Sequence, residues 1–419
     1  MGGVFTSTYH DTPDGRFIRT GISLRRRVEN GLSIWEVELP DAPGEVALSE
    51  PGGPAEPPPL VADLLRGLLR ERELVEVATL QTRRSEEGEG GVRDEVAVLD
   101  GRHVVESFEV ERAPEDPGLL VIRKRRRARG PNIADLRKIT ALPYLQAMIS
   151  EQYDEILAHD PGTRLGTDPE ALHKFRVAVR RLRAVLRGAG PILDRAWTDQ
   201  LRAELAWLGR ALGAVRDHDV LLQHVRAQGP TMSPDEQAPL ERLAEAINAQ
   251  REGARGELLE VLSSPRYLEL LGRIELAGEM PRWNGVRRSV KNLAVREFRK
   301  FERELDRFGP EPSNAELHRL RVRGKRVRYA GELAAPAVGK PAHRFVARAK
   351  KVQDVLGEHQ DAVVAEHRLR ELIRAKRDPG IAFVAGRLIE RQHLRTTAAR
   401  RLTPKVLRKL RKAGRKAWG

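Results

Sequence analysis

The sequence predicts an α+β protein of two domains, an N-terminal antiparallel β domain followed by an all-α domain. Three observations support this division. Short β-rich runs separated by turn dipeptides fill residues 1–125, long segments with apolar spacings of three and four begin near residue 133, and the net charge changes sign between the two parts. With 419 residues, the chain is long enough for each domain to bury its own core.

The N-terminal part is predicted to be a meandering antiparallel sheet. Its expected strands lie at residues 6–9, 24–28, 33–39, 76–82, 92–99 and 104–110. The dipeptides Asp14-Gly15, Asn30-Gly31 and Asp100-Gly101 are typical of the turns between paired strands. A Pro/Gly-rich loop at residues 51–59 is expected to precede a helix at residues 60–72.

The C-terminal part is predicted to be a bundle of roughly eight helices, because its helical periodicity is interrupted mainly at prolines. These include Pro161, Pro191, Pro230, Pro265, Pro281, Pro310, Pro336 and Pro379. We expect a β domain at residues 1–125, a basic linker at 126–141, a helical domain at 142–410 and a basic tail at 411–419. The helical domain is expected to contain two halves, at about residues 142–280 and 281–410.

Charge indicates an anionic partner for the helical part. The chain carries 75 Lys and Arg against 60 Asp and Glu, a net charge of +15. Residues 1–120 hold 13 basic and 24 acidic side chains, or −11, which leaves +26 for the remainder. Such a field attracts phosphate chains, nucleic acids and anionic membranes alike, so the choice among them must come from geometry.

Cysteine usage and hydropathy narrow the class of protein further. The absence of cysteine excludes disulfides, thiolate metal sites and cysteine nucleophiles, and it is compatible with a reducing cytoplasm. No apolar run approaches 18 residues, and the first residues lack the apolar segment of a signal peptide. We therefore expect a soluble cytoplasmic protein without a membrane span, and its oligomeric state is left open.

An internal repeat organises the helical part. Residues 172–183 (LHKFRVAVRRLR) align with residues 317–328 (LHRLRVRGKRVR) at an offset of 145. Residues 212–217 (LGAVRD) align with residues 356–361 (LGEHQD) at an offset of 144. Two ordered motif pairs at nearly the same separation predict two copies of one half-domain.

Each copy carries a stripe of cationic side chains. At about 100° per residue, the stripe residues of the first copy fall within an arc of roughly 80°, and apolar residues occupy the opposite side. The first stripe consists of His173, Arg176, Arg180, Arg183 and Arg187, and the second of His318, Arg321, Lys325 and Arg328. The two stripes are expected to face one channel, whether a closed tunnel or an open groove.

The composition of the stripes suits a linear polyanion. Arginine offers a planar fork of donors to phosphate oxygens, lysine adds a point charge, and histidine donates hydrogen bonds near neutral pH. Cations spaced three and four residues apart recur at about 5 Å, once per helical turn. A basic stripe on one helix is usually a solvated face, but its repetition in identical register favours binding.

Four other residues of the repeat can have a structural role instead of a role in ligand binding. His173 and His318 lie early in their helices, where a histidine either contacts the ligand or serves as a core or capping residue. Asp217 and Asp361 are expected at a helix junction, where they cap a turn or pair with a nearby arginine. Two acids so far apart in sequence do not specify a metal site.

The repeated motifs resemble the CHAD family, the histidine-containing α-helical domain, over about residues 142–410. This resemblance implies two four-helix bundles related by a pseudo-twofold axis around a basic cavity. It also implies binding of inorganic polyphosphate, often at polyphosphate granules. The residues that match the family are His173, Arg176, Arg180, Arg181 and Arg183 in the first copy, and His318, Arg321, Lys325, Arg326 and Arg328 in the second.

The first 125 residues resemble a CYTH domain, a β-tunnel that handles triphosphates and often precedes a CHAD domain. The resemblance assigns Arg25 and Arg27 to tunnel arginines, places Arg83 in a later basic strand, and makes Glu109 and Glu111 candidate metal ligands. The family's Glu-x-Glu-x-Lys strand has no counterpart in the seven residues before Thr8.

A second departure lies at Glu38, which occupies the position of a phosphate-binding lysine. We therefore expect a degenerate, incomplete tunnel and a non-enzymatic polyphosphate-binding protein without a cofactor. The alternatives are a metal-dependent inorganic triphosphatase, which needs Mg²⁺ or Mn²⁺ in the tunnel, and nonspecific nucleic-acid binding at low salt.

Overall fold

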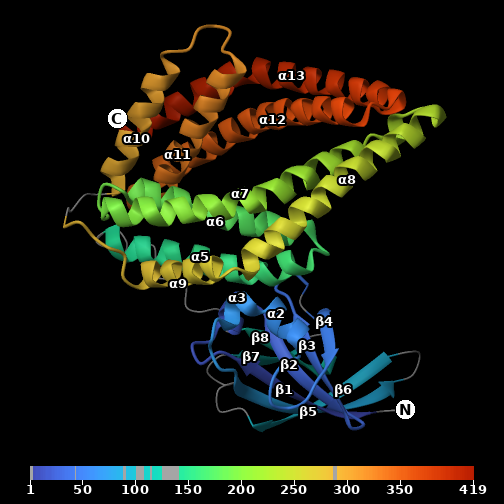
Figure 1. The fold of residues 1–419 in the computed structure, drawn as a ribbon. Helices are drawn as coiled ribbons and strands as arrows, with labels where there is room; N and C mark the ends of the chain where they lie inside the picture. The colour runs from blue at the N-terminus through green and yellow to red at the C-terminus, as the bar shows by residue number, and fades with distance from the viewer. Residues whose placement is uncertain are drawn as a thin grey trace. The chain divides into compact units, whose positions relative to one another are not determined.

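The computed structural model describes residues 3–42, 44–87, 91–100, 108–113, 116–124, 141–285 and 290–419. The chain divides into two compact units. The first comprises residues 1–130, 151–178 and 262–272, and the second comprises residues 131–150, 179–261 and 273–419. The first unit thus holds the β strands, the short helices between them and parts of the long helices, and the second holds most of the helical region (Figure 1).

An antiparallel sheet of six strands forms the centre of the first unit. The strands are β1 (Val4–Asp11), β2 (Ser23–Glu29), β3 (Leu32–Glu38), β4 (Val46–Pro51), β5 (Val75–Glu87) and β6 (Gly91–Asp100), in the order β4-β3-β2-β1-β5-β6. A separate ladder pairs β7 (Phe108–Ala113) with β8 (Asp116–Lys124). The antiparallel β domain expected from the sequence is therefore confirmed, and within the described residues the main ladder ends at β4 and β6.

Turn chemistry explains how two of these strands pair. Asn30 and Gly31, at φ 51° and 78°, close the β2–β3 hairpin in the left-handed conformation that such turns need. By contrast, Asp14-Gly15 does not join two strands directly, because the short helix α1 (Arg16–Thr20) follows it. The Asp11 carboxylate holds this helix by accepting hydrogen bonds from the backbone N–H groups of Phe17 and Ile18, at 2.8 and 3.1 Å.

The predicted strands and the observed ones differ at three places, one of which is β8, a strand that the sequence did not predict. Strand β4 was not expected, since its sequence lies beside the Pro/Gly-rich loop and its side chains are mostly exposed, so it shows little alternation. The expected strand at 104–110 is described only from Phe108 onward, within β7. The short helices α2 (Pro59–Leu64) and α3 (Arg66–Leu69) occupy the expected helical stretch and bury apolar side chains such as Val61 and Leu68.

The helical region contains α5 (Ala141–Leu165), α6 (Pro169–Ala189), α7 (Arg195–Arg226), the 3-10 turn η3 (Gly229–Thr231), α8 (Pro234–Ser263), α9 (Pro265–Glu279), α10 (Val290–Leu305), α11 (Asn314–Val338), α12 (Lys340–Lys376) and α13 (Pro379–Trp418). Most of the prolines mark helix boundaries, as expected. Pro161 and Pro336 lie inside helices instead, near the C-terminal ends of α5 and α11, and each helix continues for a few residues beyond the one backbone hydrogen bond that its proline cannot donate. No helix in the described ranges is long and apolar enough to cross a membrane.

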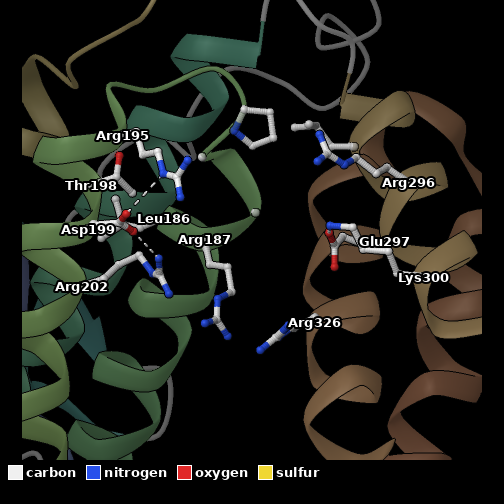
Figure 2. Close-up of a pocket in the computed structure, with 14 residues that line it drawn as sticks. Leu186, Arg187, Arg195, Thr198, Asp199, Arg202, Arg296, Glu297, Lys300 and Arg326 are labelled. Carbon is white, nitrogen blue, oxygen red and sulfur yellow. Dashed lines mark hydrogen bonds and ion pairs between the residues drawn. The ribbon is translucent and has the colours of Figure 1, made fainter. Parts of the chain in front are cut away.

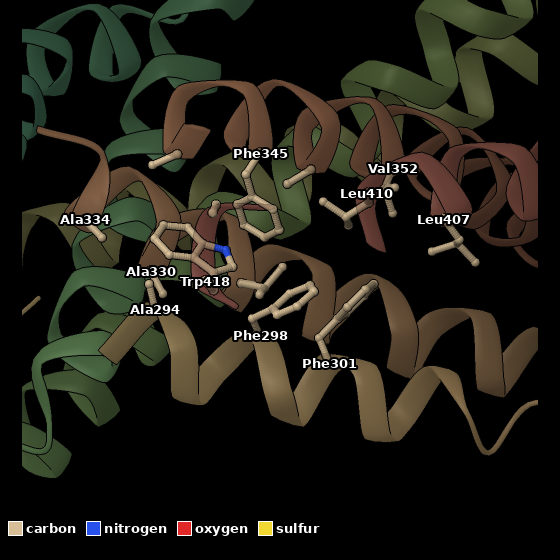
Figure 3. Packing of buried hydrophobic residues seen from close by; sticks show 14 of the residues in the cluster. Ala294, Phe298, Phe301, Ala330, Ala334, Phe345, Val352, Leu407, Leu410 and Trp418 are labelled. Atoms are coloured by element: carbon tan, nitrogen blue, oxygen red, sulfur yellow. The ribbon is translucent and has the colours of Figure 1, made fainter. Parts of the chain in front are cut away.

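Two hydrophobic clusters hold the second unit together. One joins α10, α11, α12 and the end of α13, and it includes Phe298, Phe301, Phe345 and Trp418 (Figure 3). Phe345 packs edge-on against Phe298 and Trp418, with ring centroids 5.6 and 5.3 Å away. The other cluster joins α7 and α8 to the opposite ends of α12 and α13. Burial of Trp418 shows that residues 411–419, expected to be a basic tail, continue helix α13 into this core.

The repeat motifs occupy equivalent helices. The two stripe motifs lie on α6 and α11, and the two Leu-Gly motifs lie on α7 and α12. Asp217 and Asp361 are therefore inside long helices, so the expectation of a helix junction was wrong. Glycine within each motif does not end the helix here, because the apolar spacing continues on both sides of it.

Candidate functional site

A cleft with a volume of about 450 Å³ opens between α6 and α7 on one side and α10 and α11 on the other. That volume falls within the range of ordinary ligand pockets. Its charged lining consists of Arg187, Arg195, Asp199, Arg202, Arg296, Glu297, Lys300 and Arg326. Figure 2 shows Arg187 and Arg326 extending toward each other from opposite walls. Arg187 belongs to the first stripe and Arg326 is a motif residue of the second copy, so both copies contribute to this cleft.

The two acids of the cleft are already engaged. Asp199 accepts a hydrogen bond from Arg202 at 2.7 Å and lies 3.7 Å from Arg195. Glu297 accepts a hydrogen bond from Lys300 at 2.5 Å. Six cations and two carboxylates leave a charge excess of four in the cleft.

Arg187 and Arg326 are the two cleft cations whose pKa values are lowered, and the charge of Glu297 offsets this lowering only in part. Within the part of the chain that the structure describes, neither forms an ion pair with a carboxylate. Partial burial, followed by the charges of Arg326, Arg202 and Arg183, lowers the pKa of Arg187 to about 10. Burial, followed by the charge of Arg323, also lowers the pKa of Arg326.

Arg183 adds another positive charge to this group of arginines. Its own pKa is lowered by burial and by the charges of Arg202 and Arg210. Guanidinium groups keep their charge near neutral pH even so. An anion placed among them would relieve both their repulsion and their incomplete hydration.

Two buried donor atoms without hydrogen-bond partners in the described part of the chain also favour an anionic ligand. The Nε atoms of Arg180 and Arg326 are buried, and among the described residues neither atom has a hydrogen-bond partner. A buried donor without an acceptor costs about 1–3 kcal/mol. A ligand rich in acceptor oxygens would recover part of that cost, and phosphate is such a ligand.

Two stripe residues of α11 face an amide and an acid of helix α12. The His318 Nδ1 atom lies 2.7 Å from the Gln360 Oε1 atom, and Arg321 lies 3.9 Å from Asp361. Burial raises the pKa of Asp361, while the charges of Arg321 and Lys325 act in the opposite direction. Asp361 thus pairs with an arginine, one of the two roles considered for it.

The middle of α11 carries a further acid beside two motif arginines. Arg328 forms an ion pair with Glu332 at 3.2 Å, one turn further along the helix. Burial raises the pKa of Glu332, and the charges of Arg328 and Arg181 oppose that rise. Arg181 of α6 is therefore close enough to α11 to act on Glu332, which again brings residues of both copies together.

The first half of the α6 stripe belongs to the first unit. His173 and Arg176 are half-buried there, and both make polar interactions. Their neighbour Lys174 donates a hydrogen bond to Asp41 at 2.5 Å, which joins α6 to the loop after β3. Of the predicted site residues, the cleft itself therefore unites Arg187 with Arg326, and Arg183 adds its charge to that field.

Several cleft residues were not anticipated from the sequence. Arg195 and Arg202 come from α7, and Arg296 and Lys300 come from α10. None of them belongs to the repeated motifs. A sequence signal existed only for α10, whose cations lie on one face of a strongly amphipathic segment.

The arginines of the β domain are compensated by neighbouring acids. Arg25 donates a hydrogen bond to Glu36 at 2.6 Å and lies 3.2 Å from Glu38. Burial alone would lower the pKa of Arg25, but Tyr9 and Glu36 outweigh it and raise the pKa. Arg27 forms an ion pair with Glu29 and stacks on the Phe5 ring at 4.0 Å. Both guanidinium groups are thus paired with acids, although the Nε atom of Arg27 has no hydrogen-bond partner among the described residues.

The other candidates of the β domain do not add a metal or phosphate site. Arg83 is exposed on β5, opposite Val4 of β1. Glu109 and Glu111 lie on β7, and their side chains are outside the described part of the chain. In the residues that the structure does describe, no three or more acidic or histidine side chains gather as metal ligands would.

Comparisons with known proteins agree with this architecture. The CHAD domain family model matches residues 147–370, more than half of the chain. Two uncharacterized proteins of Mycobacterium tuberculosis, from strains CDC 1551 / Oshkosh and H37Rv, are each 26% identical over 476 aligned residues, covering 98% of this chain and 90% of theirs.

Two solved structures share the helical fold. The CHAD domain from the plant Ricinus communis is 25% identical, with a TM-score of 0.51, and the match covers 66% of this chain and 92% of that one. PptA from Streptomyces chartreusis is 20% identical, with a TM-score of 0.55, over 64% of this chain and 99% of that one. The likeness to PptA concerns the fold alone.

Proposed function

Because the chain belongs to the CHAD domain family, we propose that it binds inorganic polyphosphate in the cleft between its two repeated halves. The observation that carries this proposal is the uncompensated pair Arg187 and Arg326. Each comes from a different copy of the repeat, and each has a lowered pKa in a cleft whose two acids are already engaged.

Polyphosphate fits this arrangement because every unit of the chain carries negative charge and acceptor oxygens along a thin, flexible backbone. The guanidinium forks of Arg187 and Arg326 would each bind oxygens of one or two units from opposite sides. Arg296 and Lys300 would hold the chain at the α10 wall. We propose that Arg180, Arg181, Arg183, Arg321, Lys325 and Arg328 extend the surface along α6 and α11, with His173, Arg176 and His318 as further contacts.

Binding without turnover is the second part of the proposal. The cleft holds no group of metal ligands among its described lining residues, and its acids are engaged by Arg202 and Lys300. In the β domain, the arginines that resemble those of a triphosphate tunnel are paired with Glu36, Glu38 and Glu29. This pairing favours binding over triphosphatase activity. A protein that binds polyphosphate would also gather at polyphosphate granules in the cytoplasm, which a fluorescent fusion would reveal.

Titration calorimetry with polyphosphate tests the proposal. We expect saturable binding that weakens steeply with salt, as contacts to a counterion-coated polyanion do. Changing Arg187 and Arg326 together to Gln should reduce affinity by at least about 30-fold, since each charge-assisted contact contributes roughly 1.5–3 kcal/mol and some coupling is expected. Unchanged affinity in that double variant would show that the cleft is not the binding site.

A further inference from the structure

The last 29 residues of the chain carry an unusual charge distribution. Residues 391–419 contain 11 Lys and Arg and no Asp or Glu. They form the second half of α13 and lie beyond residue 370, where the match to the CHAD family model ends.

The core fixes which side of α13 faces outward. Leu407, Leu410 and Trp418 are buried in the cluster with α10, α11 and α12 (Figure 3). On the opposite side, five exposed cations are spaced by four, three, four and four residues, within an arc of about 80°. These are Arg401, Lys405, Arg408, Lys412 and Lys416, here called the α13 stripe. It extends for about 22 Å along the helix.

The acids near this stripe pair with other arginines and do not neutralise it. Arg411 pairs with Glu302 at 3.1 Å and with Asp306 at 2.8 Å, and Arg415 pairs with Glu302 at 3.2 Å. Those two arginines lie beside the stripe and pair with Glu302 of α10 and with Asp306, the residue that follows α10. None of the five stripe residues forms an ion pair with any residue that the structure describes. A hollow of about 400 Å³ on this surface is lined only by cations, Arg408, Arg411, Lys412, Arg415 and Lys416.

Helix α10 connects this stripe to the cleft. Arg296 and Lys300 line the cleft, whereas Glu302 and Asp306 face α13. On the helical wheel of α10, Arg299 and Arg303 fall between these two faces, and both are exposed. Cations therefore continue from the cleft, across the outer face of α10, to the α13 stripe.

We propose that the α13 stripe is a second polyphosphate-binding surface, which takes the part of a long chain that extends past the cleft. This inference rests on the proposed function of the cleft. A thin flexible chain can follow the cationic route over α10 and enter a hollow of this size. An anionic membrane is less suited, because the apolar side of this helix is buried in the core and cannot insert into lipid.

Chain length separates the two surfaces experimentally. A short chain of roughly ten phosphates can be held by the cleft alone, whereas a chain of roughly a hundred can engage the stripe as well, at high effective concentration. The test variant is full-length protein with Arg408→Gln, Lys412→Gln and Lys416→Gln. The matched control is Arg226→Gln, Arg374→Gln and Lys376→Gln, which removes the same charge from exposed positions at the far ends of α7 and α12.

We expect the stripe variant to bind the long chain about tenfold more weakly, with a smaller salt dependence, and to bind the short chain within about twofold of the wild type. The control variant should bind both chains within about twofold of the wild type. Equal loss for both chain lengths, or no loss for either, would overturn the inference and leave the cleft proposal standing.

Two further outcomes have distinct meanings. If the wild type bound neither chain, the proposed function itself would fail. If the stripe variant lost affinity only for duplex DNA, measured in parallel at physiological salt, the stripe would be a nucleic-acid surface and the polyphosphate inference would be wrong. Circular dichroism of both variants checks that the helical content is retained.

Discussion

Replacing Arg326 by glutamine should stabilise the ligand-free protein slightly and weaken its binding of polyphosphate. Arg326 lies in the middle of α11, so the helix dipole contributes little to its energy. Its pKa is lowered by burial and by neighbouring cations, which means that the folded protein disfavours its charged form. This cost is present at neutral pH and disappears only as the pH rises above the folded-state pKa.

The magnitude follows from the exposure of the site. Arg326 is partly buried but still in contact with solvent, and screening limits its repulsion from each neighbouring cation to about 0.2–0.5 kcal/mol. Arg326→Gln should therefore raise the free energy of unfolding by about 0.5 kcal/mol in the absence of ligand. Polyphosphate affinity should fall by about 1.5–3 kcal/mol, or more than tenfold.

Urea unfolding at pH 7 and low salt, together with calorimetric titration, measures both quantities. Arg323→Gln is the matched control, because Arg323 lies on the same helix and its charge lowers the pKa of Arg326, but it does not line the cleft. We expect this control to bind polyphosphate within about threefold of the wild type. A large loss of stability in the Arg326 variant would refute the reasoning, since it would show that the arginine stabilises the fold instead of serving mainly to bind the ligand.

Four other predictions follow from named contacts. Asp361→Asn should reduce the gain in polyphosphate affinity on acidification, because the pKa of Asp361 is raised and its protonation in the wild type removes a negative charge beside Arg321 and Lys325; calorimetry at a series of pH values below 7 checks this. Glu332→Gln should strengthen binding about two- to fivefold at pH 7 by removing a negative charge beside Arg181 and Arg328, and weaker binding would contradict that role. Trp418→Ala should lower the free energy of unfolding by about 3–5 kcal/mol in urea titrations, whereas Lys416→Ala, on the exposed side of the same turn, should change it by less than about 0.5 kcal/mol. Incubation with tripolyphosphate and Mg²⁺ or Mn²⁺ should release no phosphate, because Glu36 and Glu29 hold Arg25 and Arg27; release that is lost on changing Arg25 to Ala would restore the triphosphatase alternative.

Local patterns predicted most of the secondary structure. The helical period placed the stripes on α6 and α11, and the Asn30-Gly31 turn identified the β2–β3 hairpin, because both signals depend on residues close in sequence. The repeat went further, since identical register in two segments implies equivalent structures. It therefore predicted that the two copies would share an architecture.

Features set by tertiary packing were harder to predict. The acids that compensate Arg25 lie on the neighbouring strand β3, and only Glu38 was recognised beforehand as unfavourable for phosphate. The cleft walls contributed by α7 and α10 could not be inferred, because helical periodicity shows which residues share a face but not which helix that face meets. Pro161 was expected to end a helix, but α5 continues past it to Leu165, because tertiary packing can outweigh the local preference of a proline.

The central claim is that uncompensated arginines from both copies of the repeat hold a phosphate chain. Competitive titration of the wild type and the Arg187→Gln, Arg326→Gln variant tests it most directly, with long-chain polyphosphate as ligand and duplex DNA as competitor at physiological salt. We expect the wild type to bind polyphosphate in the presence of excess DNA, and the double variant to lose at least about 30-fold in affinity. Equal affinity of the two proteins for polyphosphate, or its displacement by stoichiometric DNA, would contradict the claim.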